Sequence, residues 1–373
     1  MNLHKNIQVK PVYTYLTPGP SALFPSVATH LQNALEAQVP SISHRSVAFQ
    51  DIYQEADQHL RALLGLPANY RVLFCASANE IWERLLQNCV AHTSAHLVNG
   101  AFSRRFYQFA LWLQKSPFLH EVAEGQGFEI SQMPPFPADV ELLALTHNET
   151  STGVAMPEAD LHALARQYPD ALTVVDMVSS APYPALDYGR VDSAYFSVQK
   201  AFGLPAGLGV WLVGPRGYEK AQSLEKKGQI TGTYHRLTAL WKEADNFQTP
   251  ETPNVLAIYL LAKIAGEMRA KGLATIRESL QQQAAQLYQK AETMPQGRAF
   301  VQNPAWRSPT VVVVESPLAL KIRTALKEKG FVVGSGYKPF QDTQLRIANF
   351  PATSTLEMQH FHKAWEEVMA ALD

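Results

Sequence analysis

Cysteine is scarce in this chain of 373 residues, since Cys75 and Cys89 are the two that it contains. Both lie in apolar segments, and their spacing fits neither a disulfide framework nor a zinc site. We therefore predict no metal site and a reducing, cytoplasmic setting. No stretch approaches the roughly 18 apolar residues of a membrane-spanning helix, and residues 1–16 lack the apolar core of a secretory signal. A soluble protein without a membrane partner is expected.

Charge is also limited and balanced. Charged residues make up 17% of the chain, with 32 Lys and Arg against 33 Asp and Glu. No broad basic field is available to follow a nucleic-acid backbone, so we predict no nucleic-acid partner. The nucleotide-binding patterns GxGxxG and GxxxxGK[ST] are both absent. The hydrophobic fraction of 46% is ample for a folded core, and the length favours one large domain with a smaller one.

The first part of the chain alternates short apolar runs with longer amphipathic segments. Alternation of buried strands with crossover helices is typical of a mostly parallel sheet covered by helices on both faces. We therefore predict a three-layer α/β sheet domain. The expected strands are 71–77, 95–100, 141–149, 171–180, 193–200 and 207–214.

The pattern changes near residues 248–254, where the sequence reads QTPETPN. A long helical stretch follows, and then two expected strands, 310–316 and 345–350, separated by a helix and followed by a last amphipathic helix. We predict a large domain over 1–254 and a smaller α/β domain over 255–373.

Polar residues lie at the carboxyl ends of several of the expected strands. Ser77, the segment 148–151, Asp176 and Lys200 all occupy such positions. In open parallel sheets, ligands bind outside the carboxyl ends of the strands. These residues are therefore the first candidates for a functional site.

Lys200 and Asp176 suggest a particular chemistry. A partly desolvated lysine has a lowered pKa and forms Schiff bases with carbonyl groups. A carboxylate at a strand end is the partner that a pyridoxal phosphate ring requires to keep its nitrogen protonated. Each residue also has a structural alternative, because Lys200 can be an ordinary solvated strand-end lysine and Asp176 can form a helix cap or an ion pair.

The turn at residues 77–79, Ser-Ala-Asn, is suited to hold a phosphate. Small residues let the backbone approach an anion, and the start of the following helix presents unpaired N–H groups. Simple capping of that helix by Ser77 or Asn79 is the structural alternative.

Seven segments together resemble the class V aminotransferases, a branch of the fold type I pyridoxal-phosphate enzymes, and within that branch the phosphoserine aminotransferases. SHRS and the QK of SVQK are more specific to the phosphoserine branch than the DxVSS pattern of VVDMVSS, which other class V members share. The segments are TPGPSALFP (17–25), ISHRS (42–46), THNETSTG (146–153), VVDMVSS (174–180), SVQKAFGLPAGLG (197–209), QTPETPN (248–254) and LRIANFP (345–351).

The resemblance implies pyridoxal 5'-phosphate as cofactor and a homodimer with shared active sites. Lys200 would bind the cofactor covalently, and Asp176 would pair with the ring nitrogen. Phe102 would stack on the ring, unless it is plain core, and Thr150 would bond the ring oxygen. The implied phosphate ligands are Ser77, Ala78, Gln199 and, from the neighbouring subunit, Thr249.

For the substrates, the resemblance assigns Arg346 to the α-carboxylate, unless it is a surface arginine, and His44 with Arg45 to the substrate phosphate. The implied reaction moves an amino group between glutamate and 3-phosphohydroxypyruvate, in serine biosynthesis. Residues 77–80, SANE, lack the second arginine common in phosphoserine aminotransferases. Phe102 replaces a frequent tryptophan, and Leu204 is an extra residue. These departures favour the alternative, a serine–pyruvate or alanine–glyoxylate type of aminotransferase.

Two further alternatives are disfavoured by single residues. A cysteine desulfurase of the same fold has histidine before the lysine, where this chain has Gln199. A catalytically silent binding protein is expected to have lost Lys200 or Asp176, and both are present.

Overall fold

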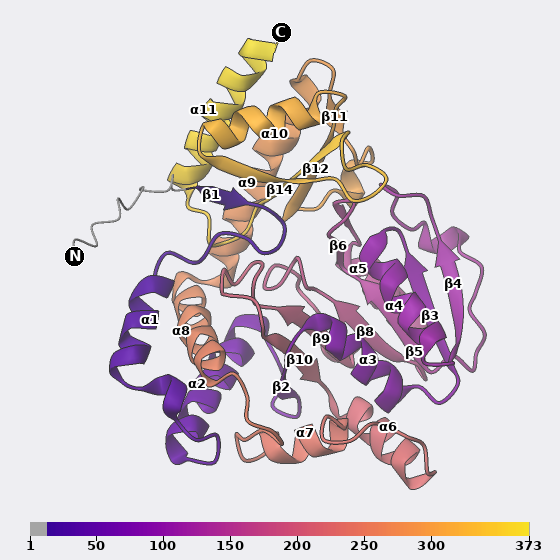
Figure 1. Cartoon of the computed structure of the whole chain (residues 1–373). Coiled ribbons are helices and arrows are strands. Elements are labelled where there is room, and N and C mark those ends of the chain that lie inside the picture. The colour runs from indigo at the N-terminus through magenta and orange to yellow at the C-terminus, as the bar shows by residue number, and fades with distance from the viewer. Residues whose placement is uncertain (1–12, 373) are drawn as a thin grey trace, which may run out of the picture.

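The computed structural model describes residues 13–372, so residues 1–12 of the predicted large domain lie outside the described part. Its larger sheet has the strand order β2-β10-β9-β8-β5-β3-β4, in which β10 is antiparallel to both neighbours and the other pairs are parallel (Figure 1). The strands are β2 (Arg71–Cys75), β3 (Thr93–Val98), β4 (Ser116–Glu121), β5 (Leu142–Thr146), β8 (Leu172–Asp176), β9 (Ser193–Ser197) and β10 (Gly209–Val213). The predicted mostly parallel α/β sheet is confirmed.

Burial explains which strands the sequence revealed. The central strands β8, β9 and β10 are buried along their whole length and read as continuous apolar runs, as strands covered on both faces do. The edge strand β4 is half exposed, with the sequence SPFLHE. It carries no apolar run, which is why our sequence analysis did not predict it.

Helices that connect these strands pack against the larger sheet. Among them, α3 packs beside α4 and α6, and α2 packs along the later helix α8 (Val255–Lys271). The helices before α8 are α1 (Val27–Glu36), α2 (Val47–Leu64), α3 (Ala78–Cys89), α4 (Ala101–Trp112), α5 (Glu158–Gln167), α6 (Pro215–Lys226) and α7 (Leu237–Ala244), with the short 3-10 turns η1 (Val39–Ser41) and η2 (Ile130–Gln132).

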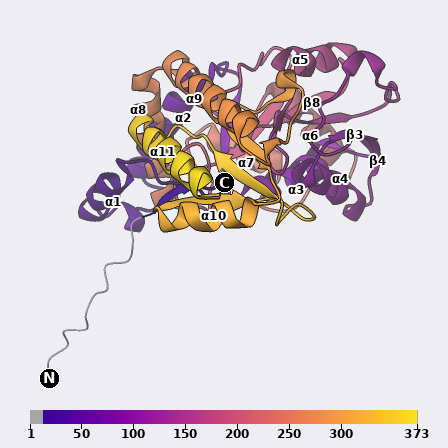
Figure 2. The same ribbon diagram turned by 90° about the horizontal axis from the view of Figure 1, so that it is seen from above.

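A second sheet with the order β1-β13-β14-β12-β11 forms the smaller unit, which lies above the larger sheet in Figure 1. Viewed from above, α9 and α11 lie side by side (Figure 2), and Lys290 of α9 pairs with Glu366 of α11 at 2.5 Å. The elements are β1 (Thr14–Leu16), α9 (Leu273–Thr293), β11 (Arg298–Ala299), η3 (Pro304–Trp306), β12 (Val311–Glu315), α10 (Ala319–Glu328), β13 (Phe331–Ser335), β14 (Gln344–Ala348) and α11 (Thr355–Leu372).

The hydrophobic cores divide at a different place from the predicted boundary at residue 254. Helix α8 belongs to the core of the larger unit, and the division falls within α9, between Leu280 and Ala284. Strand β1, from the start of the chain, pairs with β13 of the smaller sheet. Helix α8 packs against α1, α2 and α9, and it is correspondingly apolar on several faces. Its sequence therefore does not reveal which unit it joins.

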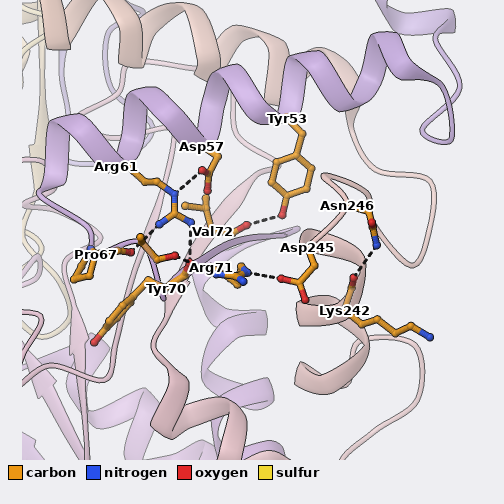
Figure 3. A network of polar contacts seen from close by, with 11 residues as sticks. Tyr53, Asp57, Arg61, Pro67, Tyr70, Arg71, Val72, Lys242, Asp245 and Asn246 are labelled. Carbon is orange, nitrogen blue, oxygen red and sulfur yellow. Dashed lines mark hydrogen bonds and ion pairs between the residues drawn. The ribbon is translucent and has the colours of Figure 1, made fainter.

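A polar network fastens the end of α2 to the start of β2 (Figure 3). Arg61 donates through Nε to Asp57 at 2.5 Å, and through its other nitrogens to the carbonyls of Pro67 and Tyr70 at 2.8 and 2.7 Å. Arg71 pairs with Asp245 at 2.6 Å, which joins β2 to the segment after α7. No helix among residues 13–372 has the length and apolar character to cross a membrane.

Candidate active site

A cavity of about 430 Å³ lies at the carboxyl ends of the central strands. Both sheets contribute to it, because Arg346 of β14 faces the ends of β8 and β9 across it. The lining residues are Pro18, Gly19, Pro20, Ser77, Ala78, Asn79, Trp82, Phe102, Thr146, Asn148, Thr150, Asp176, Val178, Ser197, Gln199, Lys200, Ala206, Tyr337 and Arg346.

Lys200 is buried in this cavity, with 6% of its surface exposed. Its Nζ donates to Thr150 Oγ1 at 2.9 Å and lies 5.1 Å from the centre of the Phe102 ring. Burial lowers the pKa of Lys200 from 10.5 to about 8, while the negative charges of Asp176 and Glu149 act against this shift. The solvated strand-end alternative for Lys200 is therefore wrong.

Asp176 ends strand β8 and is buried. Burial raises the pKa of its carboxyl group from 3.8 to about 6, against the effects of a hydrogen bond from the Val178 N–H (2.9 Å) and of Lys200. The Trp82 indole N–H and the Tyr195 hydroxyl both lie beside the Asp176 carboxylate. The indole N–H donates to the hydroxyl at 2.7 Å. A buried carboxylate in this setting is suited to face a cationic ring nitrogen.

Arg346 and Thr150 connect the two sheets at the cavity. Arg346 Nη1 donates to the Thr150 carbonyl at 3.0 Å, and its Nε donates to the Ser335 carbonyl at 2.7 Å. The guanidinium also lies 5.0 Å from the centre of the Tyr337 ring, and that ring meets Phe102 edge to face at 5.3 Å. Arg346 is half-buried, so the surface alternative for it is wrong, and Phe102 faces the cavity with part of its surface exposed.

The predicted phosphate turn lies at the start of α3. Ser77 caps the helix by accepting from the Glu80 N–H at 3.3 Å, as the structural alternative predicted, and it also lines the cavity. The Ala78 N–H donates to Ser197 Oγ at 3.0 Å. Gly209 allows this approach, because a Cβ there would lie 2.7 Å from the Ser77 carbonyl carbon. Gln199 lines the same side of the cavity.

Three predicted residues lie outside the cavity, close to one another. Thr249 is buried and donates to the Glu251 carbonyl at 2.7 Å. Arg45 donates to Glu243 and Gln248 at 3.1 and 3.0 Å, and His44 Nδ1 lies 3.4 Å from Thr252 Oγ1. The segments 42–46 and 248–254 thus form one cluster, and the structure does not bring it into the cavity of its own chain.

Several cavity residues were missed by the sequence analysis. Trp82, Ser197 and Tyr337 line the cavity, and the Tyr195 hydroxyl lies beside Asp176. Trp82 and Tyr195 read as ordinary core residues of a helix and a strand. Tyr337 lies in a loop without periodicity. Glu149 belongs to the segment 148–151, which is among the first candidates from the sequence, but no role was predicted for it.

Comparison with known proteins agrees with this geometry. The family model of the class-V aminotransferases matches residues 129–350. A solved phosphoserine aminotransferase from Cytophaga hutchinsonii is 44% identical, with a TM-score of 0.93 over 95% of this chain and 98% of that one. A phosphoserine aminotransferase from Rhodococcus opacus is 28% identical over 95% of this chain and 94% of its own length.

A more distant structure shares the fold alone. The ureidoglycine–glyoxylate aminotransferase of Bacillus subtilis is 22% identical, with a TM-score of 0.82 over 97% of this chain and 94% of that one. The family match spans more than half of the present chain and includes Asp176, Lys200 and Arg346. The chain therefore belongs to the class-V aminotransferase family.

Proposed function

We propose that this aminotransferase binds pyridoxal 5'-phosphate on Lys200 and moves an amino group between phosphoserine and 2-oxoglutarate. The observation that carries the proposal is the buried Lys200 amine, which faces Phe102 and Thr150 in a cavity that also contains Asp176. The relatives from Cytophaga hutchinsonii and Rhodococcus opacus, both named phosphoserine aminotransferases, support the choice of substrate.

The side chains present fit this cofactor. A cavity of about 430 Å³ lies within the range of small-molecule sites, roughly 300–1,000 Å³. Asp176 would hold the ring nitrogen, Thr150 the ring oxygen and Phe102 one ring face, and Ser77, Ala78 and Gln199 would hold the phosphate. When bound, the cofactor supplies an electron-withdrawing ring that takes up the electron pair left at Cα when a substrate loses its proton.

Lys200 is suited to move that proton. An amine whose pKa burial has lowered to about 8 exists in both protonation states near neutral pH, as a group that first accepts and then returns a proton must. Thr150 Oγ1 fixes the position of the amine. We therefore assign Lys200 the transfer of the proton from the substrate Cα.

Arg346 is placed to bind the substrate carboxylate. Two of its five N–H groups donate to the carbonyls of Ser335 and Thr150 among the described residues, which fixes the plane of the guanidinium. A guanidinium held in this way presents its remaining donors to a carboxylate as a fork.

The cluster of His44, Arg45 and Thr249 supports a dimer. All three lie outside the cavity of their own chain, yet the family resemblance assigns them to phosphate groups. We infer that they complete the site of a second subunit, so that each site draws on two chains. The loop contacts of Arg45 with Glu243 and Gln248 hold the cluster together in one chain.

Substrate choice is tested with Arg45→Ala. Loss of a guanidinium that pairs with a partly buried dianion costs about 2–5 kcal/mol, so we expect kcat/KM to fall steeply for phosphoserine, moderately for glutamate and hardly for alanine. Arg298→Ala, at an exposed ion pair with Glu315 in the smaller unit, is the control. Equal effects on all three substrates, with a wild type that prefers alanine or serine, would favour a serine–pyruvate or alanine–glyoxylate activity instead.

A further inference from the structure

Glu149 is a fully buried carboxylate for which the proposed reaction has no role so far. It ends the short strand β6 (Asn148–Glu149), which pairs with β7 (Val154–Ala155), and its exposed fraction is 0%. No ion pair among residues 13–372 includes Glu149. A buried charge without an ion-pair partner is costly unless hydrogen bonds satisfy it, so its surroundings are informative.

The carboxylate of Glu149 is satisfied by the start of α4 and by the turn after β6. Its Oε2 accepts from the Ser103 N–H at 2.9 Å and its Oε1 from the Phe102 N–H at 3.3 Å. Oε1 also accepts from the N–H and the hydroxyl of Ser151, at 3.0 and 2.6 Å. The Ser151 hydroxyl in turn accepts from the Ala101 N–H at 2.9 Å. Glu149 and Ser151 together thus supply the acceptors that the first turn of α4 requires.

Gly100 shows that this approach is built into the fold. A Cβ at Gly100 would lie 2.5 Å from both Glu149 Cγ and Ser151 Oγ. Any other residue at position 100 would push the carboxylate away from the helix. The glycine therefore serves the contact between α4 and the segment that contains Glu149.

The residues on either side of this contact are those that surround Lys200. Phe102, whose N–H bonds Glu149, has its ring 5.1 Å from Lys200 Nζ. Thr150, the next residue after Glu149, accepts from Lys200 Nζ through its hydroxyl and from Arg346 through its carbonyl. The charge of Glu149 also acts on both cations, because it raises the pKa of Lys200 and that of Arg346 against the lowering effect of burial.

We propose that Glu149 is a positioning residue for the reaction: its carboxylate fastens the start of α4 to the 148–151 turn and so holds Phe102 and Thr150 beside Lys200. Phe102 and Thr150 thereby share one anchor. The proposal rests on the proposed function, since it assigns Glu149 to the site built around Lys200.

The test measures the pKa of Lys200 in cofactor-free protein, from the pH dependence of its labelling by an amine-reactive reagent, followed by peptide mass spectrometry. Glu149→Gln keeps the shape of the side chain and removes its charge. We expect the pKa of Lys200 to fall by about one unit, a tenfold change in the protonation equilibrium. The charged groups that act on Lys200 are Asp176, Arg346 and Glu149. Of these, the wild type and Glu149→Gln differ only at position 149.

Glu141→Gln is the matched control. Glu141 also accepts from three backbone N–H groups, those of Ala91, His92 and Thr93, but it lies just before β5, at the end of that strand opposite the cavity. Both variants should lose stability, and only Glu149→Gln should change the titration of Lys200. An unchanged pKa of Lys200 in Glu149→Gln, or an equal change in Glu141→Gln, would overturn the proposal.

Glu149→Asp covers the case in which Glu149→Gln does not fold. It retains the charge and withdraws the carboxylate by one methylene, so we expect the pKa of Lys200 to stay near that of the wild type and the dissociation constant of pyridoxal phosphate to rise at least about tenfold, equivalent to 1.4 kcal/mol. An unchanged dissociation constant would overturn the positioning role. A wild-type protein that binds no pyridoxal phosphate would refute the proposed function instead, and the titration of Lys200 would still be readable.

Discussion

Strand β2 has a polar network near each end. In one network the charged groups are paired with opposite charges, and in the other they have no direct ion pair. At its start, Arg61 is neutralised by Asp57 and satisfied by two carbonyls, and Arg71 is paired with Asp245 (Figure 3). Beyond its carboxyl end, Lys200 and Asp176 are buried without a direct ion pair among the described residues. Burial lowers the pKa of Lys200 and raises that of Asp176, so it favours the neutral form of each.

The difference separates stability from chemistry. Charges that are paired and hydrogen-bonded hold elements together. Charges that are buried and left partly unpaired cost stability but are ready to exchange protons near neutral pH. Substitutions at the first end of β2 should therefore act on unfolding, and substitutions at the second end on catalysis.

The largest effect is expected for Lys200→Ala, which removes the amine that we assign to proton transfer and to the covalent bond with the cofactor. Activity should fall at least about 10³-fold, since general acid–base groups contribute about 10²–10⁴. Borohydride reduction of the wild type should fix the cofactor on Lys200, as mapped by peptide mass spectrometry. Labelling of another lysine, such as the surface residue Lys263, would refute the assignment.

Asp176→Asn should show the next largest effect. An amide does not stabilise a protonated ring nitrogen, so kcat should fall about 10²-fold, equivalent to about 2.7 kcal/mol of transition-state stabilisation, while the cofactor remains bound. Steady-state kinetics and absorbance of the bound cofactor check this pair of outcomes. A variant with near-normal kcat would contradict the role given to Asp176.

Much of the site could be predicted from the sequence, because its central residues follow buried strands. Lys200 and Asp176 lie at the ends of largely apolar runs, where a sequence pattern is strongest, and the role of Thr150 came from the resemblance. The roles of Phe102 and Arg346 came from the resemblance to class V aminotransferases, and the structure places both at the cavity.

What could not be predicted depends on contacts between distant segments. Tyr337 reaches the site through the packing of one unit on the other, and Glu149 contacts α4 through the packing of α4 on β6. No local pattern encodes either contact. The pairing of β1 with β13 is likewise a contact across almost the whole chain. Thr249 and Arg45 remain predictions, since a single chain holds them away from its own cavity.

Arg61→Ala tests the other end of β2. The substitution removes three hydrogen bonds and leaves Asp57, which is 7% exposed, without its cation. We expect the free energy of unfolding to fall by about 2–3 kcal/mol and kcat to stay within the error of the wild type. Urea unfolding followed by circular dichroism measures the first quantity. Lys242→Ala, at an exposed position on the same surface, is the control and should change neither.

The last effect, similar in size, is the pH dependence of stability that Asp176 imposes on the cofactor-free protein. Its pKa is about 6 when folded, above 3.8, so between these values the folded state binds a proton that the unfolded state has released. Stability must then decrease as pH rises through this window. Asp176→Asn lacks this titration, and groups distant from position 176 cancel in the difference between the two proteins. Lys200, whose pKa Asp176 raises, titrates at a lower pH in the variant, which changes the difference in the same direction. Relative to the variant, the wild type should lose about 2–3 kcal/mol of unfolding free energy from pH 4 to pH 7, at about 1.4 kcal/mol per unit. Urea unfolding at several pH values measures this difference. A difference that stays constant, or that grows in favour of the wild type, would mean that Asp176 is as well satisfied as Asp57, and the contrast between the two ends of β2 would fail.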